Sequence, residues 1–160
     1  MTGAIVLLAL VTAQRLGELV LARRNTARLL AQGGVEHGAA HYPAIVALHA
    51  AWLGGLWLLA WDRPIHFGWL ATYLVLQGLR AWVLLSLGPR WTTRIITMPG
   101  ETLVRRGPYR FVSHPNYLVV AGEIAVLPLV FGLPLYALTF SVLNAIILAV
   151  RIRAESRALR

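Results

Sequence analysis

The stretch "HFGWLATYLVLQGLRAWVLLSL", residues 66–87, is apolar over the length of a bilayer crossing and carries a single arginine, Arg80. About 20 consecutive, mostly apolar residues are enough for an α-helix to cross the hydrocarbon core of a membrane. The stretch therefore predicts a transmembrane helix, and its neighbours in the sequence decide how many more the chain contains.

Further apolar runs predict four more helices. They lie at about 3–22, 43–61, 117–132 and 134–151, and the last two are joined by "FGLPLY", 131–136, whose Gly and Pro predict a tight helical hairpin. The 160 residues are 58% hydrophobic with a mean hydropathy of +0.67, too apolar for an ordinary soluble domain. The predicted fold is all-α, a polytopic membrane protein with about five transmembrane helices in one domain, residues 1–160.

The arginines predict the orientation. All fifteen basic residues are arginines, the net charge is +9, and twelve of the arginines lie in three segments: 23–42, 88–116 and the tail from 151. The short "DRP" segment, 62–64, holds one. Basic loops stay in the cytoplasm, so the N-terminus should lie outside a bacterial inner membrane and the long connection 88–116 inside. Arginines at the ends of apolar runs favour membrane lipids as partners and not nucleic acid.

Several chemistries are excluded or disfavoured. The chain has no cysteine, which removes disulfides, thiolate nucleophiles and zinc–thiolate sites. His41 and His49, in "HYPAIVALHA", have no carboxylate at the spacing of a zinc-binding helix. We therefore expect no metal, and packing or interfacial roles for these histidines.

Four charged side chains lie inside the predicted spans, together with a polar asparagine: Arg15, Glu18, Arg80, Glu123 and Asn144. An unpaired charge at mid-membrane costs about 2.5–3.5 kcal/mol, so these residues should face protein or a wet cavity. Arg15 and Glu18 share a helix face and can neutralise each other, and Glu123 needs a cationic partner or a proton. Two interpretations stay open: structural pairs that hold helices together, or the lining of a substrate pocket.

The chemically specific stretch is "RRGPYRFVSHPNYLVV", residues 105–120. Its "GPYR" is a turn that aims Tyr109, and Pro115 suits the first turn of a helix, where free N–H groups can hold an anion. His114 and the tyrosines add donors and aromatic faces. The stretch predicts a site for a zwitterionic ligand, and the alternative is an interfacial anchor rich in Arg and Tyr.

"RRGPYRFVSHPNYLVVAGE", followed by the apolar hairpin and "RIRAES", resembles the isoprenylcysteine carboxyl methyltransferase family. "QRLGELVLARRN", "GGVEHGAAHYPAIVALH", "RIITMPG" and "LNAIILAVRIRAE" resemble its bacterial branch that is often encoded beside type III polyketide synthases. The resemblance covers almost the whole chain. Two positions depart from the family pattern: Ser113 replaces an arginine before His-Pro, with Arg106 and Arg110 nearby, and the C-terminal acidic pair is reduced to Glu155.

The resemblance implies methyl transfer from S-adenosylmethionine, arriving from the cytoplasm, to a lipophilic small molecule in the bilayer. It assigns Arg110 and Arg151 to anion positioning and Glu155 to cofactor binding or proton acceptance. The implied cofactor pocket consists of Tyr109, His114, Pro115, Asn116, Tyr117 and Glu155. The expected acceptor is a long-chain polyketide such as an alkylpyrone or alkylresorcinol.

Two alternatives remain. The first is carboxyl methylation of an isoprenylcysteine-like or other lipid acid. The second is a small transporter or channel subunit, with paired charges along a continuous cavity. The sequence leaves the oligomeric state open.

Overall fold

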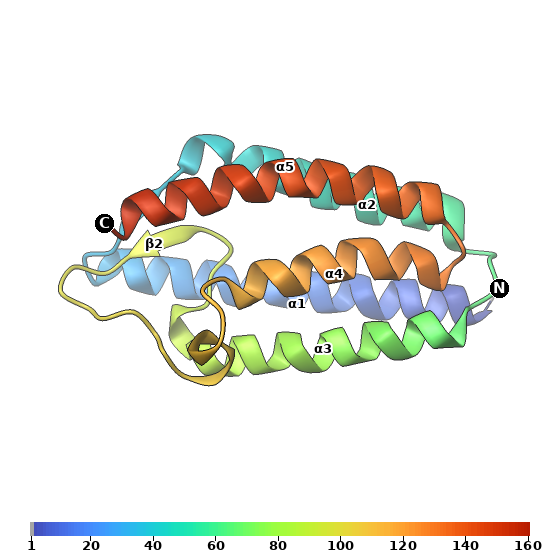
Figure 1. The fold of residues 1–160 in the computed structure, drawn as a ribbon, viewed down its shortest axis with the longest axis horizontal. Coiled ribbons are helices and arrows are strands. Elements are labelled where there is room, and N and C mark those ends of the chain that lie inside the picture. The colour runs from blue at the N-terminus through green and yellow to red at the C-terminus, as the bar shows by residue number, and fades with distance from the viewer. Residues whose placement is uncertain (1) are drawn as a thin grey trace.

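The structure, a computed structural model, describes residues 2–160. Five α-helices run along its long axis: α1 (Thr2–Ala31), α2 (Tyr42–Ala60), α3 (Phe67–Leu87), α4 (Pro115–Val130) and α5 (Pro134–Ala158). Successive helices alternate in direction, so the two termini lie at opposite ends of the bundle (Figure 1). Four of the helices, α1, α2, α3 and α5, are long and apolar enough to cross a membrane. The prediction of an all-α polytopic membrane protein is confirmed.

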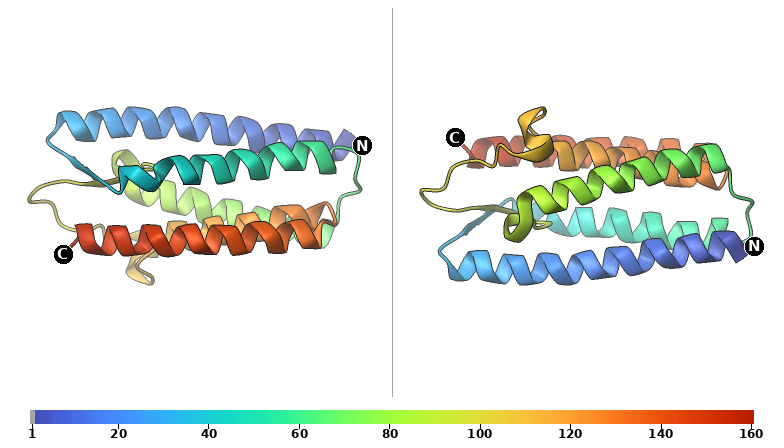
Figure 2. Two further views of the ribbon diagram at one scale, coloured as in Figure 1. Left: turned by 90° about the horizontal axis from the view of Figure 1, so that it is seen from above. Right: turned by 90° about the horizontal axis from the view of Figure 1, so that it is seen from below.

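Helix α4 is shorter and lies deeper than the others. Its 16 residues extend roughly 24 Å at 1.5 Å per residue, less than the hydrocarbon core of a bilayer. It packs mainly against α3 and α5, while α2 lies between α1 and α5 when the bundle is seen from above (Figure 2). Ile124, Leu127 and Val130 of α4 are fully buried in the main apolar core with Leu8 and Leu56. Its neighbours thus shield α4 from lipid along most of its length.

Helix α1 runs past the predicted membrane end at residue 22 to Ala31. The chain then turns at Gly33, whose φ of 92° favours glycine, into a short strand, β1 (Val35–His37). Strand β1 pairs antiparallel with β2 (Ile95–Thr97), an element that the sequence did not predict. We call this pair the β-ribbon. It joins the connection before α2 to the connection after α3.

Side chains reinforce the β-ribbon. Arg94 donates to the Glu36 carboxylate at 2.6 Å, and its guanidinium lies 4.2 Å from the centre of the Tyr42 ring. His37 and the Thr97 hydroxyl are 2.9 Å apart. Three 3₁₀ turns complete the connections: η1 (Ala39–His41), η2 (Gly88–Arg90) and η3 (Gly107–Arg110).

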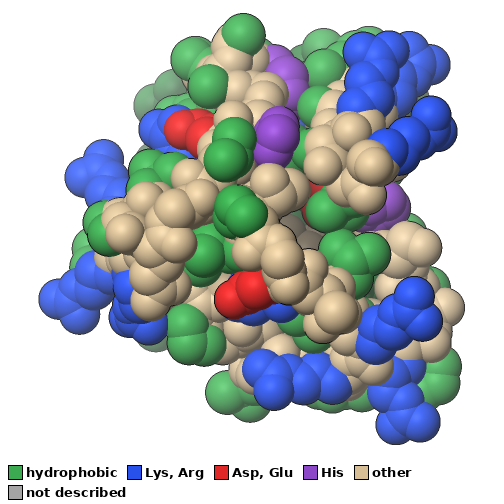
Figure 3. Space-filling view, turned by 90° about the vertical axis from the view of Figure 1, so that its left-hand side faces the viewer, with side chains coloured by type: hydrophobic (Ala, Val, Ile, Leu, Met, Phe, Trp, Pro, Cys, Tyr) green, Lys and Arg blue, Asp and Glu red, His purple; other side chains and the backbone are tan. Residues whose placement is uncertain are grey.

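All these connections gather at one end of the bundle, together with the end of α5 (Figure 1). The three arginine-rich segments meet there, and the "DRP" segment lies at the opposite end. Seen end-on, arginine side chains surround this face and a hollow opens near its centre (Figure 3). The fold therefore brings segments far apart in sequence to one basic face.

Candidate functional site

Two cavities adjoin near the basic face. One, of about 330 Å³, lies among the helices and has mostly apolar walls. The other, of about 850 Å³, lies under the connection 88–114 beside the end of α5 and is more polar. We call them the apolar cavity and the polar cavity. Five residues line both and form the wall between them: Trp91, Thr92, Asn116, Tyr117 and Arg151.

The two cavities draw on different parts of the chain. Every residue that lines the polar cavity lies at position 87 or later. Most residues that line the apolar cavity come from α1 and α2. Leu16, Leu19 and Val46 line the apolar cavity and are also 60%, 42% and 47% exposed. They form a rim between α1 and α2, where the cavity meets the lateral, apolar surface of the bundle.

A network of paired charges forms one side of the apolar cavity. Arg15 contacts Glu123 at 2.5 Å, and Arg80 contacts Glu123 at 3.1 Å and Glu18 at 2.5 Å. Gln77 donates to Glu123 at 3.0 Å and accepts from Gln14 at 2.7 Å. We call Arg15, Glu18, Arg80 and Glu123 the charge network. Its two positive and two negative charges balance, as buried charges require.

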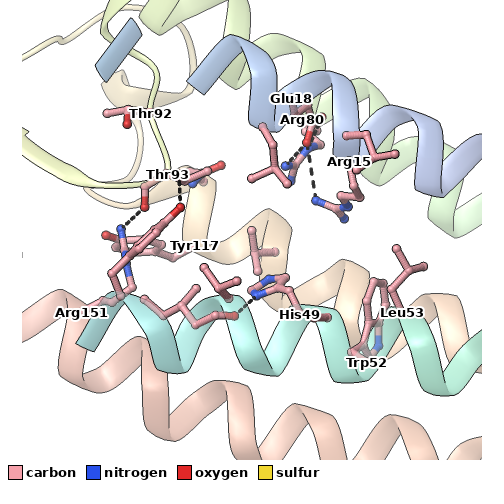
Figure 4. A pocket seen from close by; sticks show the side chains of 18 of the residues that line it. Arg15, Glu18, His49, Trp52, Leu53, Arg80, Thr92, Thr93, Tyr117 and Arg151 are labelled. Carbon is pink, nitrogen blue, oxygen red and sulfur yellow. Dashed lines mark hydrogen bonds and ion pairs between the residues drawn. The ribbon is translucent and has the colours of Figure 1, made fainter. Parts of the chain in front are cut away.

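Most of the polar residues predicted for the membrane spans belong to the charge network. Arg15, Glu18 and Arg80 line the apolar cavity, as Figure 4 shows. Glu123 is fully buried behind them and lines neither cavity. Asn144 is buried elsewhere in α5, lines neither cavity, and its Oδ1 has no hydrogen-bond partner within residues 2–160. The structure thus brings four of the five predicted pocket residues together and leaves Asn144 apart.

The wall between the cavities joins the start of α4 to the end of α5. The Tyr117 hydroxyl donates to Glu155 at 2.7 Å, and His114 Nδ1 lies 3.5 Å from the same carboxylate. The rings of His114 and Tyr117 stack with centroids 5.4 Å apart. The guanidinium of Arg151 lies 5.8 Å from the centre of the Tyr117 ring. These contacts fix an aromatic face, a carboxylate and a guanidinium close together.

Arg151 has no acidic partner in the described part of the chain. It is 7% exposed and donates to the carbonyl oxygen of Thr93 at 2.9 Å. Within residues 2–160, no carboxylate lies within 4 Å of its guanidinium. A buried cation without a counter-ion is costly, so Arg151 is suited to receive an anionic group from a ligand (Figure 4).

Local sequence explains how the motif is presented. Pro115 occupies the first turn of α4 and His114 is the residue before it, so the first N–H groups of the helix are free, as predicted. Gly107 has a φ of 59°, which lets the chain turn into η3 and direct Tyr109 inward against the buried cluster that contains Trp91 and Val119. Burial, and then the nearby Glu155 carboxylate, raise the pKa of the Tyr109 hydroxyl, which keeps it a hydrogen-bond donor.

The remaining predicted residues lie as follows. Tyr109, Asn116 and Glu155 line the polar cavity together with His114 and Tyr117. Pro115 is buried and shapes the helix start without lining either cavity. Arg110 lines the polar cavity but is exposed, with its guanidinium 5.9 Å from the centre of the Phe111 ring. Ser113, at the position where the family pattern has arginine, also lines this cavity.

Sequence reasoning missed residues 91–93, two of which belong to the wall. Trp91, Thr92 and Thr93 lie in the long connection, and Thr93 binds Arg151 through its carbonyl and the Tyr42 hydroxyl through its own hydroxyl, at 2.9 Å. Trp91, four residues after the end of the predicted span 66–87, was a local signal for this segment. Two threonines in a loop carry none, because their role comes from the β-ribbon.

Residues 69–160, more than half of the chain, match the sequence profile of the isoprenylcysteine carboxyl methyltransferase family. Over 159 residues the chain is 40% identical to the uncharacterized protein YpbQ of Bacillus subtilis, covering 96% of this chain and 95% of that protein. It is 25% identical over 162 residues to an uncharacterized protein of Haemophilus influenzae, covering 94% and 91%. No solved structure matches the chain. By this profile, and with the motif residues gathered around one pair of cavities, the chain belongs to the isoprenylcysteine carboxyl methyltransferase family.

Proposed function

We propose that this protein is an S-adenosylmethionine-dependent methyltransferase that methylates an oxygen of a lipophilic acceptor, with the acceptor in the apolar cavity and the methyl donor in the polar cavity. The family suggests a membrane methyltransferase with a lipid or isoprenylcysteine-like acceptor, and its members in general use S-adenosylmethionine. The observation that carries the proposal is the shared wall, because two ligands on either side of it would meet at Tyr117 and Arg151.

The polar cavity fits the methyl donor chemically. S-adenosylmethionine supplies a methyl group on a sulfonium cation and also carries an amine and a carboxylate. Glu155 offers a negative charge to the cationic part, and the tyrosine rings offer aromatic faces worth about 0.5–2 kcal/mol to a cation. Arginines of the same cavity and the free N–H groups at the start of α4 suit the carboxylate. Asn116 adds a buried Oδ1 with no partner within the described chain.

Arg151 is the residue that would hold the acceptor oxygen. Among residues 2–160 its guanidinium has no acidic partner, and it lines both cavities, so a carboxylate or phenolate there would complete an ion pair. A carboxylate acceptor needs no base. For a phenol, Glu155 or His114, which lie together beside Tyr117 at the wall, would accept the proton. Alignment and exclusion of water should supply most of the rate acceleration, since an in-line methyl transfer needs little further chemistry from the protein.

The acceptor would enter from the membrane through the rim formed by Leu16, Leu19 and Val46. The methyl donor would enter at the basic face, which we place in the cytoplasm of a bacterial inner membrane, with the N-terminus outside. Because the chain has no cysteine, single cysteines at Asp62 and Leu159 can be labelled from one side at a time. Labelling of Asp62→Cys from outside and protection of Leu159→Cys would support this orientation, and the reverse pattern would overturn it.

The narrower prediction of a long-chain polyketide acceptor gains no support from the family profile, and it stays a prediction. The transporter alternative needs a polar path between the two faces of the membrane. The fully buried Leu8, Leu56 and Phe131 belong instead to an apolar core that fills the half of the bundle towards the N-terminus. No observation in the described chain favours transport.

Titration calorimetry with S-adenosylmethionine on protein in detergent micelles tests the proposal. Glu155→Gln removes the charge at the wall and should weaken binding about 10- to 100-fold, since hydrogen bonds to charged groups contribute about 1.5–3 kcal/mol. Asp62→Asn, at the opposite end of the bundle, is the matched control and should bind normally. Absence of binding to the folded wild-type protein would overturn the proposal, as would equal affinities of the wild type and Glu155→Gln.

A further inference from the structure

His49 is a polar group in the apolar cavity that the proposed mechanism does not use. It lies in the middle of α2, and its ring is directed into the cavity opposite Arg15 and Arg80 (Figure 4). Sequence analysis assigned it a packing or interfacial role. The structure places it instead where a ligand would touch it.

The hydrogen bonding of the ring fixes which nitrogen can accept a proton or hydrogen bond. His49 Nδ1 lies 2.9 Å from the backbone oxygen of Ile45, one turn earlier in α2. A carbonyl oxygen only accepts, so Nδ1 carries the hydrogen, and in the neutral imidazole Nε2 holds the lone pair. Within residues 2–160, no side chain or backbone group donates to Nε2. In the middle of α2, the cavity therefore contains a free acceptor on a ring held by its own helix.

The charged residues beside His49 do not supply a hydrogen-bond donor to its Nε2. Both acids of the charge network are engaged with arginines, and both arginines with acids. Many of the other lining side chains, among them Leu16, Leu19, Ile45, Val46 and Leu53, are apolar. A purely hydrocarbon ligand would displace water from Nε2 and leave the lone pair without a partner, which weakens binding.

We propose that His49 determines acceptor specificity by accepting a hydrogen bond from a hydroxyl group on the lipophilic acceptor. This inference rests on the proposed function and narrows it, because it names a class of acceptor: a long-chain lipid whose head carries a hydroxyl group in addition to the methylated oxygen. Alkyl tails then leave through the rim at Leu16, Leu19 and Val46. A fatty acid without a hydroxyl group would bind less well than a hydroxylated lipid of the same length.

The test compares two probes that differ in one hydroxyl group, 4-dodecylphenol and dodecylbenzene. Binding to protein in nanodiscs of phosphatidylcholine and phosphatidylglycerol is followed through tryptophan fluorescence, since Trp52 and Trp91 line the cavity. The measured quantity is the ratio of the two dissociation constants, and comparing this ratio between variants in the same nanodiscs cancels the probes' different partitioning into lipid. His49→Phe keeps a ring of similar shape without nitrogen, and His49→Leu is the second variant. His66→Leu, an exposed histidine that lines neither cavity, is the control.

The wild type and His66→Leu should prefer the phenol, and both His49 variants should lose about tenfold of that preference while binding dodecylbenzene as before. An unchanged preference in the His49 variants, or an equal loss for both probes, would overturn the inference. The assay contains no S-adenosylmethionine, so its outcome is separate from the calorimetric test. Normal cofactor binding with no role for His49 would refute only the hydroxyl assignment.

Discussion

The charge network allows a sharp test of how the bundle is held together. Glu123→Gln keeps the shape of the side chain and removes one negative charge from a group that is fully buried. Arg15 and Arg80, at 2.5 and 3.1 Å from the carboxylate, would then share Glu18 alone. Leaving a buried charge uncompensated costs about 3–5 kcal/mol. For a chain of this size, that loss corresponds to a fall of roughly 6–20 °C in the midpoint of thermal unfolding.

The assay is thermal unfolding in detergent micelles, followed by circular dichroism. Glu101→Gln is the matched control: Glu101 pairs with Arg90 at 3.5 Å but is 49% exposed, so its loss should cost about 0–1 kcal/mol. A double variant, Arg15→Gln with Glu123→Gln, restores the charge balance by leaving Arg80 with Glu18. It should recover about 1 kcal/mol or more relative to Glu123→Gln. Equal melting points for Glu123→Gln and Glu101→Gln would refute the reasoning.

Three further predictions follow from single contacts. Gly107→Ala puts a Cβ on a residue with a φ of 59° and into the Ser86 side chain, so it should lower stability by about 1 kcal/mol and weaken S-adenosylmethionine binding. The control is Gly17→Ala, whose Cβ meets nothing within 4 Å, and it should change neither quantity in the same unfolding and calorimetric assays. Arg94→Gln breaks the ion pair of the β-ribbon and should speed cleavage of the connection 32–41 by proteinase K in nanodiscs, and an unchanged rate would contradict this role. Tyr117→Phe keeps the ring but removes the donor to Glu155, so calorimetry should show several-fold weaker cofactor binding, whereas Tyr136→Phe at the other end should bind normally.

The helices were predictable because the membrane imposes a length. The apolar runs at 43–61 and 66–87 lie close to the observed α2 and α3. The end of α1 was not predictable from apolarity, because residues 23–31 mix arginines and other polar residues with alanine and leucine, which are good helix formers, and contain no glycine. The β-ribbon could not be predicted from the sequence, because each strand has only three residues and the pairing joins segments about 60 positions apart.

The candidate site also has a part that could be predicted from the sequence and a part that could not. His114 and Tyr117 were foreseen as neighbours, since both belong to one short motif at a helix start. Glu155 came from the family resemblance and does meet that motif, across the gap between α4 and α5. Thr93 and His49 were not identified, because their positions depend on how the β-ribbon folds back and on where α1 and α2 leave space between them. Such features belong to tertiary packing and leave no local pattern.

The origin of the two cavity walls has a consequence for how this enzyme could diversify. The polar cavity lies entirely within the region that defines the family, whereas the apolar cavity owes most of its lining to the first two helices, before that region begins. Under the proposed function, the residues that bind the methyl donor and most of those that select the acceptor therefore lie in separate parts of the sequence. Substitutions in α1 and α2 can change which acceptor is methylated while the residues that bind the methyl donor stay the same.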